Sequence, residues 1–216
     1  MHREGHSPLV TLIVVAAVAV TSAQAPRLEP VDQGPQKPDF MEFRTELRRA
    51  IGRRDVAGLL RAVHPNIKSS FGGDDGIDAF KQHWRLDRAD SKLWRELGAV
   101  LALGGTFVDP DQFAAPYVYS KWPETSDPFD NVALVGSNVR LRGASSASGR
   151  VLTTMSYAIL RRKEPGSRSE AWTAIVLPDG RRGYVASHLV RSPIDYRAFF
   201  ARSDGRWLMT LFVAGD

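Results

Sequence analysis

Apolar residues in the first half of the chain recur at spacings of three and four, which is the period of an amphipathic helix. This spacing predicts a first helix from Phe40 to Ile51, with Asp39 as its N-cap, and a second that follows Asp55 and ends at Pro65. Residues 67–71 alternate like a brief strand. Two more helices are predicted over residues 77–84 and 93–101, and Gly104 closes the last one.

From Asn131 onward the period changes to two, which is typical of β-strands. The alternation predicts short strands over residues 132–135, 138–142, 151–160, 172–177 and 183–185. Short strands at such close spacing favour a small barrel. Two further strands, 196–200 and 207–213, flank the turn residues Ser203, Asp204 and Gly205 and predict a C-terminal hairpin. The pattern as a whole predicts the α+β class.

The N-terminus carries an apolar run of 12 residues from Leu9 to Val20, followed by small residues. A membrane span needs roughly 20 residues, so we interpret residues 1–23 as a cleaved secretory signal, cut after Ala23. An uncleaved anchor is the alternative, because Glu4 weakens the positive charge before the run. The mature chain has no second long apolar run, so we expect a periplasmic or secreted protein without a transmembrane segment.

Composition divides the mature chain into parts. Residues 24–38 hold four prolines between Pro26 and Pro38 and predict a linker with no core of its own. Residues 24–130 carry 15 Lys and Arg against 17 Asp and Glu, whereas residues 131–216 carry 13 against 6. The basic excess therefore lies in the strand-rich part. We expect an α+β helical domain at 39–130, a barrel at 131–192 and the hairpin at 193–216.

A series of short motifs in the strand-rich part follows a characteristic order. Asn138-Val139-Arg140 comes first, a Ser-rich turn and Val151-Leu152 follow, then Trp172, and Gly180-Arg181-Arg182-Gly183-Tyr184-Val185 closes the series. This order resembles the bacterial SH3-type (SH3b) domain over residues 131–192. The polar loop from Lys163 to Glu170 is longer than is usual in that family. The resemblance implies an SH3-like barrel that serves as a targeting or ligand-binding module on envelope proteins.

The remaining residues carry a second resemblance. The terminal Asp204-Gly205-Arg206-Trp207 and the preceding helices are similar to cone-shaped NTF2-like proteins, in which a few helices pack against a curved sheet. That resemblance implies that the barrel is inserted before the last hairpin, and that the hairpin returns to pair with the N-terminal domain.

No pattern in the sequence predicts a catalytic or metal centre. The chain has no cysteine, which excludes disulfides, thiolate metal sites and cysteine nucleophiles. His64, His83 and His188 lack the spacing of metal ligands, and no cofactor is expected. The loop Gly72–Gly76 falls short of a calcium-loop pattern, so we interpret Asp74 or Asp75 as a helix cap.

The candidate binding surface combines arginines with aromatic rings in or near the predicted barrel. Arginine presents a planar fork to carboxylates and phosphates, and aromatic rings offer faces for stacking. The candidate residues are Arg140, Arg142, Tyr157, Arg161, Arg162, Arg181, Arg182 and Tyr184. The alternative is that Trp172 and Tyr184 belong to the core and the arginines are ordinary solvated charges; we expect Trp172 to be core.

These features favour a non-enzymatic binding or scaffolding protein that contacts a cell-wall component or a peptide segment of an envelope protein, and not nucleic acid. One alternative is an envelope hydrolase, with a catalytic N-terminal domain that the barrel targets to its substrate. An enzyme requires a concave pocket with convergent ionisable groups. A third interpretation, an oligomer, requires a large apolar surface on the N-terminal helices.

Overall fold

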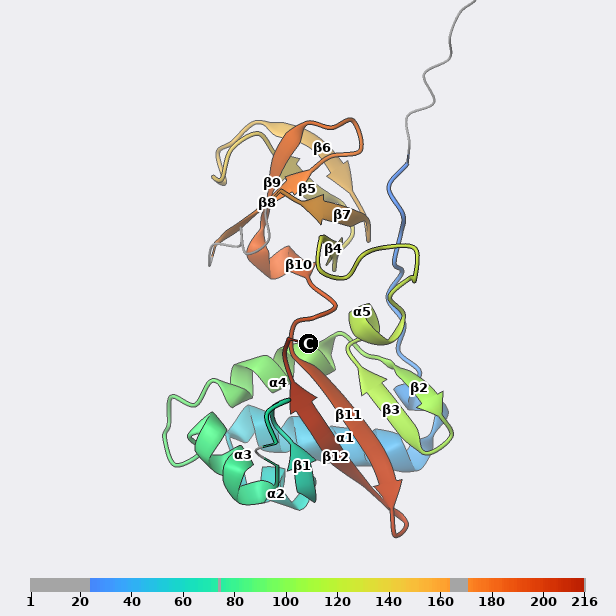
Figure 1. Ribbon diagram of the computed structural model, residues 1–216, viewed down its shortest axis with the longest axis vertical. Helices are drawn as coiled ribbons and strands as arrows, with labels where there is room; N and C mark the ends of the chain where they lie inside the picture. The colour runs from blue at the N-terminus through green and yellow to red at the C-terminus, as the bar shows by residue number, and fades with distance from the viewer. Residues whose placement is uncertain (1–23, 74, 164–170, 216) are drawn as a thin grey trace, which may run out of the picture.

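The computed structural model describes residues 24–73, 75–163 and 171–215. The predicted signal and its cleavage after Ala23 lie outside these residues, as do Asp74 and most of the polar loop between Lys163 and Glu170. The described chain is a mixed α+β protein built on two separate sheets (Figure 1). No helix in this part of the chain has the length and apolar character needed to cross a membrane.

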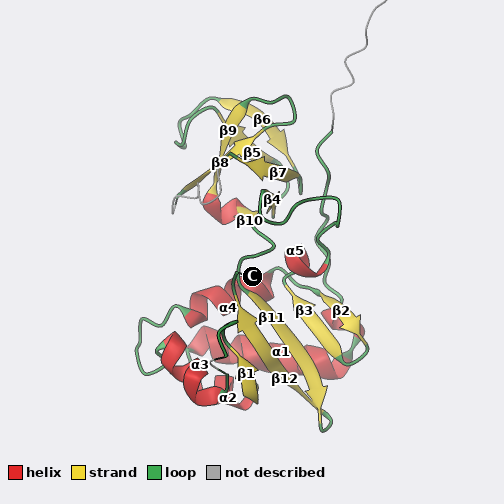
Figure 2. Cartoon of the chain, viewed as in Figure 1, coloured by secondary structure: helices red, strands yellow, loops and turns green. Residues whose placement is uncertain are grey.

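The first sheet has five strands in the order β1-β12-β11-β3-β2. β1 runs parallel to β12, and the other neighbours are antiparallel. Figure 2 shows helices covering one face of this sheet, with α1 crossing behind β11 and β12. The strands are β1 (Val63–Lys68), β2 (Thr106–Asp109), β3 (Gln112–Ala115), β11 (Arg197–Ser203) and β12 (Arg206–Val213). The helices are α1 (Pro38–Arg53), α2 (Val56–Arg61), α3 (Ile77–Trp84) and α4 (Leu93–Ala102).

Large aromatic side chains fill the space between these helices and the sheet. Phe40 of α1 is fully buried, with its ring centroid 4.3 Å from that of Phe113 and 4.9 Å from that of Trp207. Phe200 of β11 closes the group, its ring 5.9 Å from that of Phe40. One helix and three strands therefore meet in a single aromatic cluster. Its four rings exclude water together, and this burial stabilises the packing of α1 on the sheet.

The second sheet has seven antiparallel strands, and its hydrogen-bonded order runs from β10 to β6 without closing into a barrel. Its core is aliphatic and includes Leu134, Leu141, Ile175 and Val185. Residues 131–163 and 171–191 supply all of its strands. In spatial order these are β10 (Val190–Arg191), β4 (Asn131–Leu134), β7 (Ile159–Arg162), β8 (Trp172–Val176), β9 (Arg182–Ala186), β5 (Val139–Arg142) and β6 (Val151–Met155).

The C-terminal hairpin pairs with strands from the N-terminal part. β11 lies between β12 and β3, with Phe200 opposite Phe113, and β12 pairs with β1 at Val63 and Met209. The chain therefore leaves the first sheet after β3 and passes through α5 (Tyr117–Ser120). It then builds the seven-stranded sheet and returns to complete the sheet that it left.

The proline-rich segment is not the coreless linker that its composition predicts. The Leu28 amide donates to the Tyr157 carbonyl at 2.8 Å, and the Ile159 amide donates to the Pro26 carbonyl at 2.7 Å, so this stretch pairs with the seven-stranded sheet. Leu28 is only 6% exposed and packs with Tyr117, Val118, Ala133 and Ile159. Further along, the Gln33 amide donates to the Gly105 carbonyl beside β2. After a short turn, η1 (Gly34–Gln36), α1 begins.

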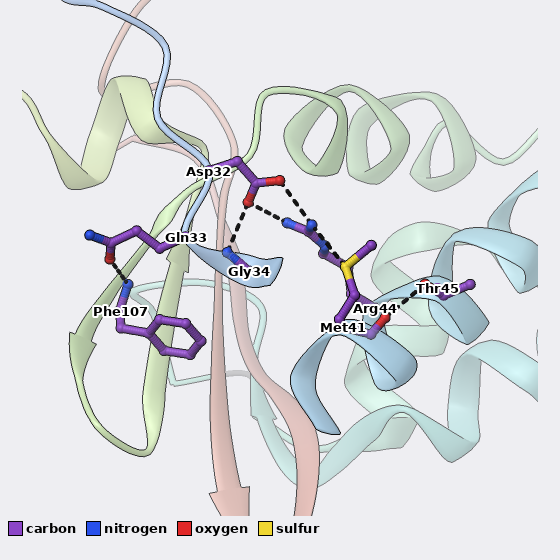
Figure 3. A network of polar contacts seen from close by, with 7 residues as sticks. All are labelled: Asp32, Gln33, Gly34, Met41, Arg44, Thr45 and Phe107. Carbon is purple, nitrogen blue, oxygen red and sulfur yellow. Dashed lines mark hydrogen bonds and ion pairs between the residues drawn. The ribbon is translucent and has the colours of Figure 1, made fainter. Parts of the chain in front are cut away.

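An ion pair between the buried Arg44 and the more exposed Asp32 fixes the end of this segment against α1 (Figure 3). The guanidinium of Arg44, whose side chain is 3% exposed, donates to both carboxylate oxygens of Asp32, at 2.6 and 2.9 Å. The same carboxylate accepts the Gly34 amide at 3.1 Å. Burial raises the pKa of Asp32, but the hydrogen bonds from Arg44 and Gly34 outweigh it, so the pKa lies below its ordinary value.

The N-caps of α1 and α3 differ from the predicted ones. Asp39 is not an N-cap, because α1 begins at Pro38, two residues before the predicted start, with Lys37 at the cap. Instead, the Asp39 carboxylate accepts the indole N–H of Trp207 at 2.9 Å. Asp55, which the predicted second helix follows, caps α2 by accepting the Gly58 amide. Gly76, and not Asp75, occupies the N-cap of α3, where its φ of 98° suits glycine.

We predict that Asp32→Asn destabilises the chain by about 2 kcal/mol at pH 7, because it leaves the buried Arg44 without its counter-charge. The depressed pKa of Asp32 means that this contribution is present above about pH 4 and is lost as the pH falls through the folded-state value. Urea unfolding of both proteins at pH 7, 4 and 3 measures the difference, which must shrink toward low pH. Asp78→Asn, which removes an exposed i,i+3 pair with Lys81, is the control and changes stability by less than about 0.5 kcal/mol.

We also predict that Leu28→Ala lowers the free energy of unfolding by about 2–4 kcal/mol, because it opens a cavity where the N-terminal segment packs against α5 and the seven-stranded sheet. Pro30→Ala, at an exposed position two residues away, is the matched control. Equal stability of the two variants in urea unfolding would show that the segment does not contribute to the fold.

Candidate functional site

Alternation along β5 and β9 divides these strands into an inner and an outer face. Leu141 and Val185 are fully buried in the core of the seven-stranded sheet. Arg140 and Arg182 are exposed and Tyr184 is half-buried. Because successive side chains of a strand point to opposite faces, these three residues lie on the outer face.

Cross-strand pairing brings further candidates onto this face. Arg142 lies directly opposite Tyr184, and Arg182 lies opposite Val176, which in turn lies opposite Arg161 of β7. Residues that pair directly share a face. We call the outer surface formed by Arg140, Arg142, Arg161, Arg182 and Tyr184 the arginine face.

Contacts within the arginine face orient its side chains. The guanidinium of Arg182 lies over the Tyr184 ring, 4.9 Å from its centroid, which is a cation–π arrangement. Arg142 donates to the Gly149 carbonyl at 2.7 Å and so ties β5 to the small-residue loop that follows it. The fork of Arg142 is thus held in place before any ligand arrives.

An open groove of about 680 Å³ lies beside the arginine face. Arg140 and Arg142 line it together with Trp172, His188 and apolar residues. The prediction that Trp172 is core is wrong: it is half-buried and lines this groove, because it is the first residue of β8 and pairs with the partly exposed Ala186. The remaining lining residues are Ser137, Asn138, Val139, Ala147, Ala171, Ala186 and Leu189.

Three of the predicted binding residues do not join the arginine face. Arg162 pairs with the buried Ile175, on the inner side, and donates to the Phe129 carbonyl. Arg181 lies in the β8–β9 turn and forms an ion pair with Asp179 at 2.7 Å. Tyr157 occupies a left-handed corner with φ of 55°, where its backbone bonds to Gly136 and Leu28.

Tyr157 lies between β6 and β7, where the chain turns, so strand alternation does not assign it to a face. Burial raises the pKa of Tyr117 to about 12, and Tyr157 and Glu29 add to the shift.

The arginine face carries an excess of positive charge. Among the described residues from 131 to 191, Asp179 is the only carboxylate, and Arg181 already neutralises it. Within the described part of the chain, no carboxylate lies within 4.0 Å of a basic nitrogen of Arg140, Arg142, Arg161 or Arg182. Four like charges on one face favour an anionic ligand.

The histidines of the chain are placed apart from one another. His64 lies in β1, where its Nδ1 accepts the Asn66 amide, and His83 contacts Trp84 at the end of α3. His188 lines the groove of the seven-stranded sheet. The described residues contain no group of three or more His, Asp or Glu side chains that could hold a metal ion.

A second cleft, of about 820 Å³, lies where the two sheets meet. Glu96 of α4, His188, Asp195 and Tyr196 are among its lining residues. Burial raises the pKa of Tyr196, and the Glu96 carboxylate adds to the effect. Asp195 lies 3.7 Å from Arg191 and accepts the Ser192 amide, so its charge is engaged within the protein.

Apolar exposure on the helices is small. Of the exposed large apolar side chains in the described chain, Met41 alone lies on a helix. The others, Phe71, Val108, Phe129 and Val151, lie in strands and loops. The described helices therefore do not present the large apolar surface that the oligomer interpretation requires.

Comparison with known proteins adds no assignment. No protein-family model matches the chain, and a search of curated proteins finds no significant match.

We predict that the arginine face is dispensable for folding. Arg140→Ser and Arg182→Ser change the free energy of unfolding by less than about 0.5 kcal/mol each, because both side chains are exposed. Arg44→Ser, which removes a buried guanidinium, costs about 3 kcal/mol and is the contrasting variant. Urea unfolding of the three variants decides whether these arginines serve stability.

Proposed function

We propose that this chain is an exported, non-enzymatic binding or scaffolding protein whose seven-stranded sheet contacts an anionic component of the cell envelope. The observation that carries the proposal is the arginine face, where four cations lie together without a carboxylate of the described chain in contact. Export is inferred from the apolar run of residues 9–20 and the small residues that follow it.

We further infer that the seven-stranded sheet is an SH3b-like module and that the helices and the five-stranded sheet form an NTF2-like unit. Three of the motifs behind the first inference fall on β5, β8 and β9, which are neighbours or next neighbours in one sheet. In support of the second, helices cover one face of a five-stranded sheet that the C-terminal hairpin completes.

The chemistry of the arginine face favours ligands that carry carboxylates or phosphates. Guanidinium groups bind both anions through two parallel hydrogen bonds, and such bonds are stronger than neutral ones. An acidic wall polymer, peptidoglycan with its peptide carboxylates, or an acidic peptide of an envelope protein meets this requirement. The groove beside Trp172 offers an aromatic surface for the uncharged part of the same ligand.

The proposal is placed at the seven-stranded sheet because the space between helices and sheet in the first unit is filled. An NTF2-like cone would hold a ligand there, but Phe40, Phe113 and Phe200 occupy that region with at most 1% of their surface exposed. A binding role on an outer surface is therefore favoured over a reaction inside the N-terminal unit.

We predict that the mature protein sediments with purified peptidoglycan at about 50 mM salt and is released at about 500 mM, because screening weakens exposed charge contacts. The triple variant Arg140→Ser, Arg161→Ser, Arg182→Ser binds at least about tenfold more weakly at low salt, since each exposed pair contributes roughly 0.5–1 kcal/mol.

The matched control is Arg49→Ser, Arg53→Ser, Arg61→Ser, which removes three exposed arginines from α1 and α2 and lowers the net charge equally. Equal loss of retention in both triple variants would mean that net charge alone drives binding. Absence of retention at either salt would refute peptidoglycan as the ligand.

A further inference from the structure

The two sheets present four edge strands, and three of them are protected against pairing. β1 contains Pro65, which has no N–H to donate. β2 is covered by the N-terminal segment, whose Gln33 side chain accepts the Phe107 amide. β10 is only two residues long and buried. Short length, proline and covering segments are the usual means by which proteins protect sheet edges.

The fourth edge strand, β6, has little of this protection. Its sequence from Val151 to Met155 contains no proline and no charged residue, and β-branched side chains form most of it. Val151 is 41% exposed, and within the described chain only β5 pairs with β6. A register shift near Leu141 and Arg142 marks a bulge at its first residues, and the rest of the strand is regular. Its outer edge therefore carries backbone N–H and C=O groups available to another strand.

The surroundings of β6 are strongly basic. Residues 131–163 contain five arginines and one lysine and no acidic residue. Arg140 lies directly opposite Thr154, Arg142 lies opposite Val151, and the exposed Arg150 immediately precedes the strand. A strand added beside β6 would thus lie within reach of three arginine side chains.

We propose that β6 is a docking edge that accepts an extended, acidic segment of a partner protein as an eighth strand of the sheet. Backbone hydrogen bonds supply the pairing, and carboxylates at alternate positions of the segment contact Arg140, Arg142 and Arg150. The proposal does not require binding of a wall polymer, because it depends on the backbone of β6.

A second copy of this chain fits the edge less well than an acidic partner does. Antiparallel pairing of two β6 strands would bring Arg140, Arg142 and Arg150 of both copies to one seam, with no carboxylate of the described sheet nearby to neutralise them. Like charges at an interface disfavour association, so the charge around β6 selects a partner of opposite sign.

The test uses capped synthetic peptides with the intact mature chain. The acidic probe is acetyl-Glu-Val-Glu-Thr-Glu-Val-Glu-Thr-amide, and the basic probe replaces each Glu by Lys. We expect the acidic probe to bind at least about tenfold more tightly at 50 mM salt and to slow amide hydrogen exchange in residues 151–155, measured by NMR. Tighter binding of the basic probe, or no binding of the acidic one, overturns the proposal.

A third probe separates edge pairing from simple charge attraction. It is the acidic peptide with all internal amides N-methylated, which keeps every carboxylate but cannot donate backbone hydrogen bonds. Loss of its binding supports the docking edge. Equal binding, with no protection of β6, overturns the docking edge and leaves anion binding by the arginine face intact.

Variants of Thr154 provide the control on the protein side. Thr154→Glu introduces a negative charge at an exposed position of β6 without breaking the strand, and we expect at least about tenfold weaker binding of the acidic probe. Thr45→Glu, at an exposed position of α1, leaves binding unchanged. Sedimentation of the free chain completes the test: a dimer whose β6 amides are protected without peptide would show that the edge serves self-association instead.

Discussion

The architecture depends on one long-range pairing, that of β11 with β3. These strands meet at four consecutive positions from Ala198 and Ala115 to Ala201 and Gln112, yet more than eighty residues separate them along the chain. All residues of the seven-stranded sheet lie between them. Because this pairing holds the two connecting segments beside each other, the second sheet is attached at both of its ends, and the N-terminal segment around Leu28 adds a third attachment.

The periodicity of the sequence predicted the helices and the hairpin, whose formation depends on residues close together in the chain. α1 to α4 and the terminal hairpin lie close to their predicted positions, because their apolar stripes and turn residues are contiguous in sequence. β2 and β3 were missed: each has four residues, and they become strands only beside β11. The structural role of residues 26–33 was missed for a similar reason, since Leu28 and Val31 are the apolar residues of a segment rich in prolines and polar side chains, and only neighbours in space bury Leu28.

Only those residues of the candidate site that lie within regular strands could be assigned to a face from the sequence. Alternation places Arg140, Arg142, Arg182 and Tyr184 on one face, since β5 and β9 are adjacent strands. It failed for Arg162, which points inward, and for Tyr157, which lies in a corner. The face on which such a residue lies depends on the register between two paired strands. Register cannot be read from one stretch of sequence, because the two strands are separate segments of the chain.

The interrupted first sheet has a consequence for how the chain acquires its structure during synthesis. A ribosome delivers residues in order from the N-terminus, so the seven-stranded sheet can form as soon as residue 191 has emerged. The five-stranded sheet cannot, because β12, which lies between β1 and β11, comes last of its strands along the chain. Until then α1 to α4 expose the apolar side chains that β11 and β12 later cover, so this half of the chain completes its core last.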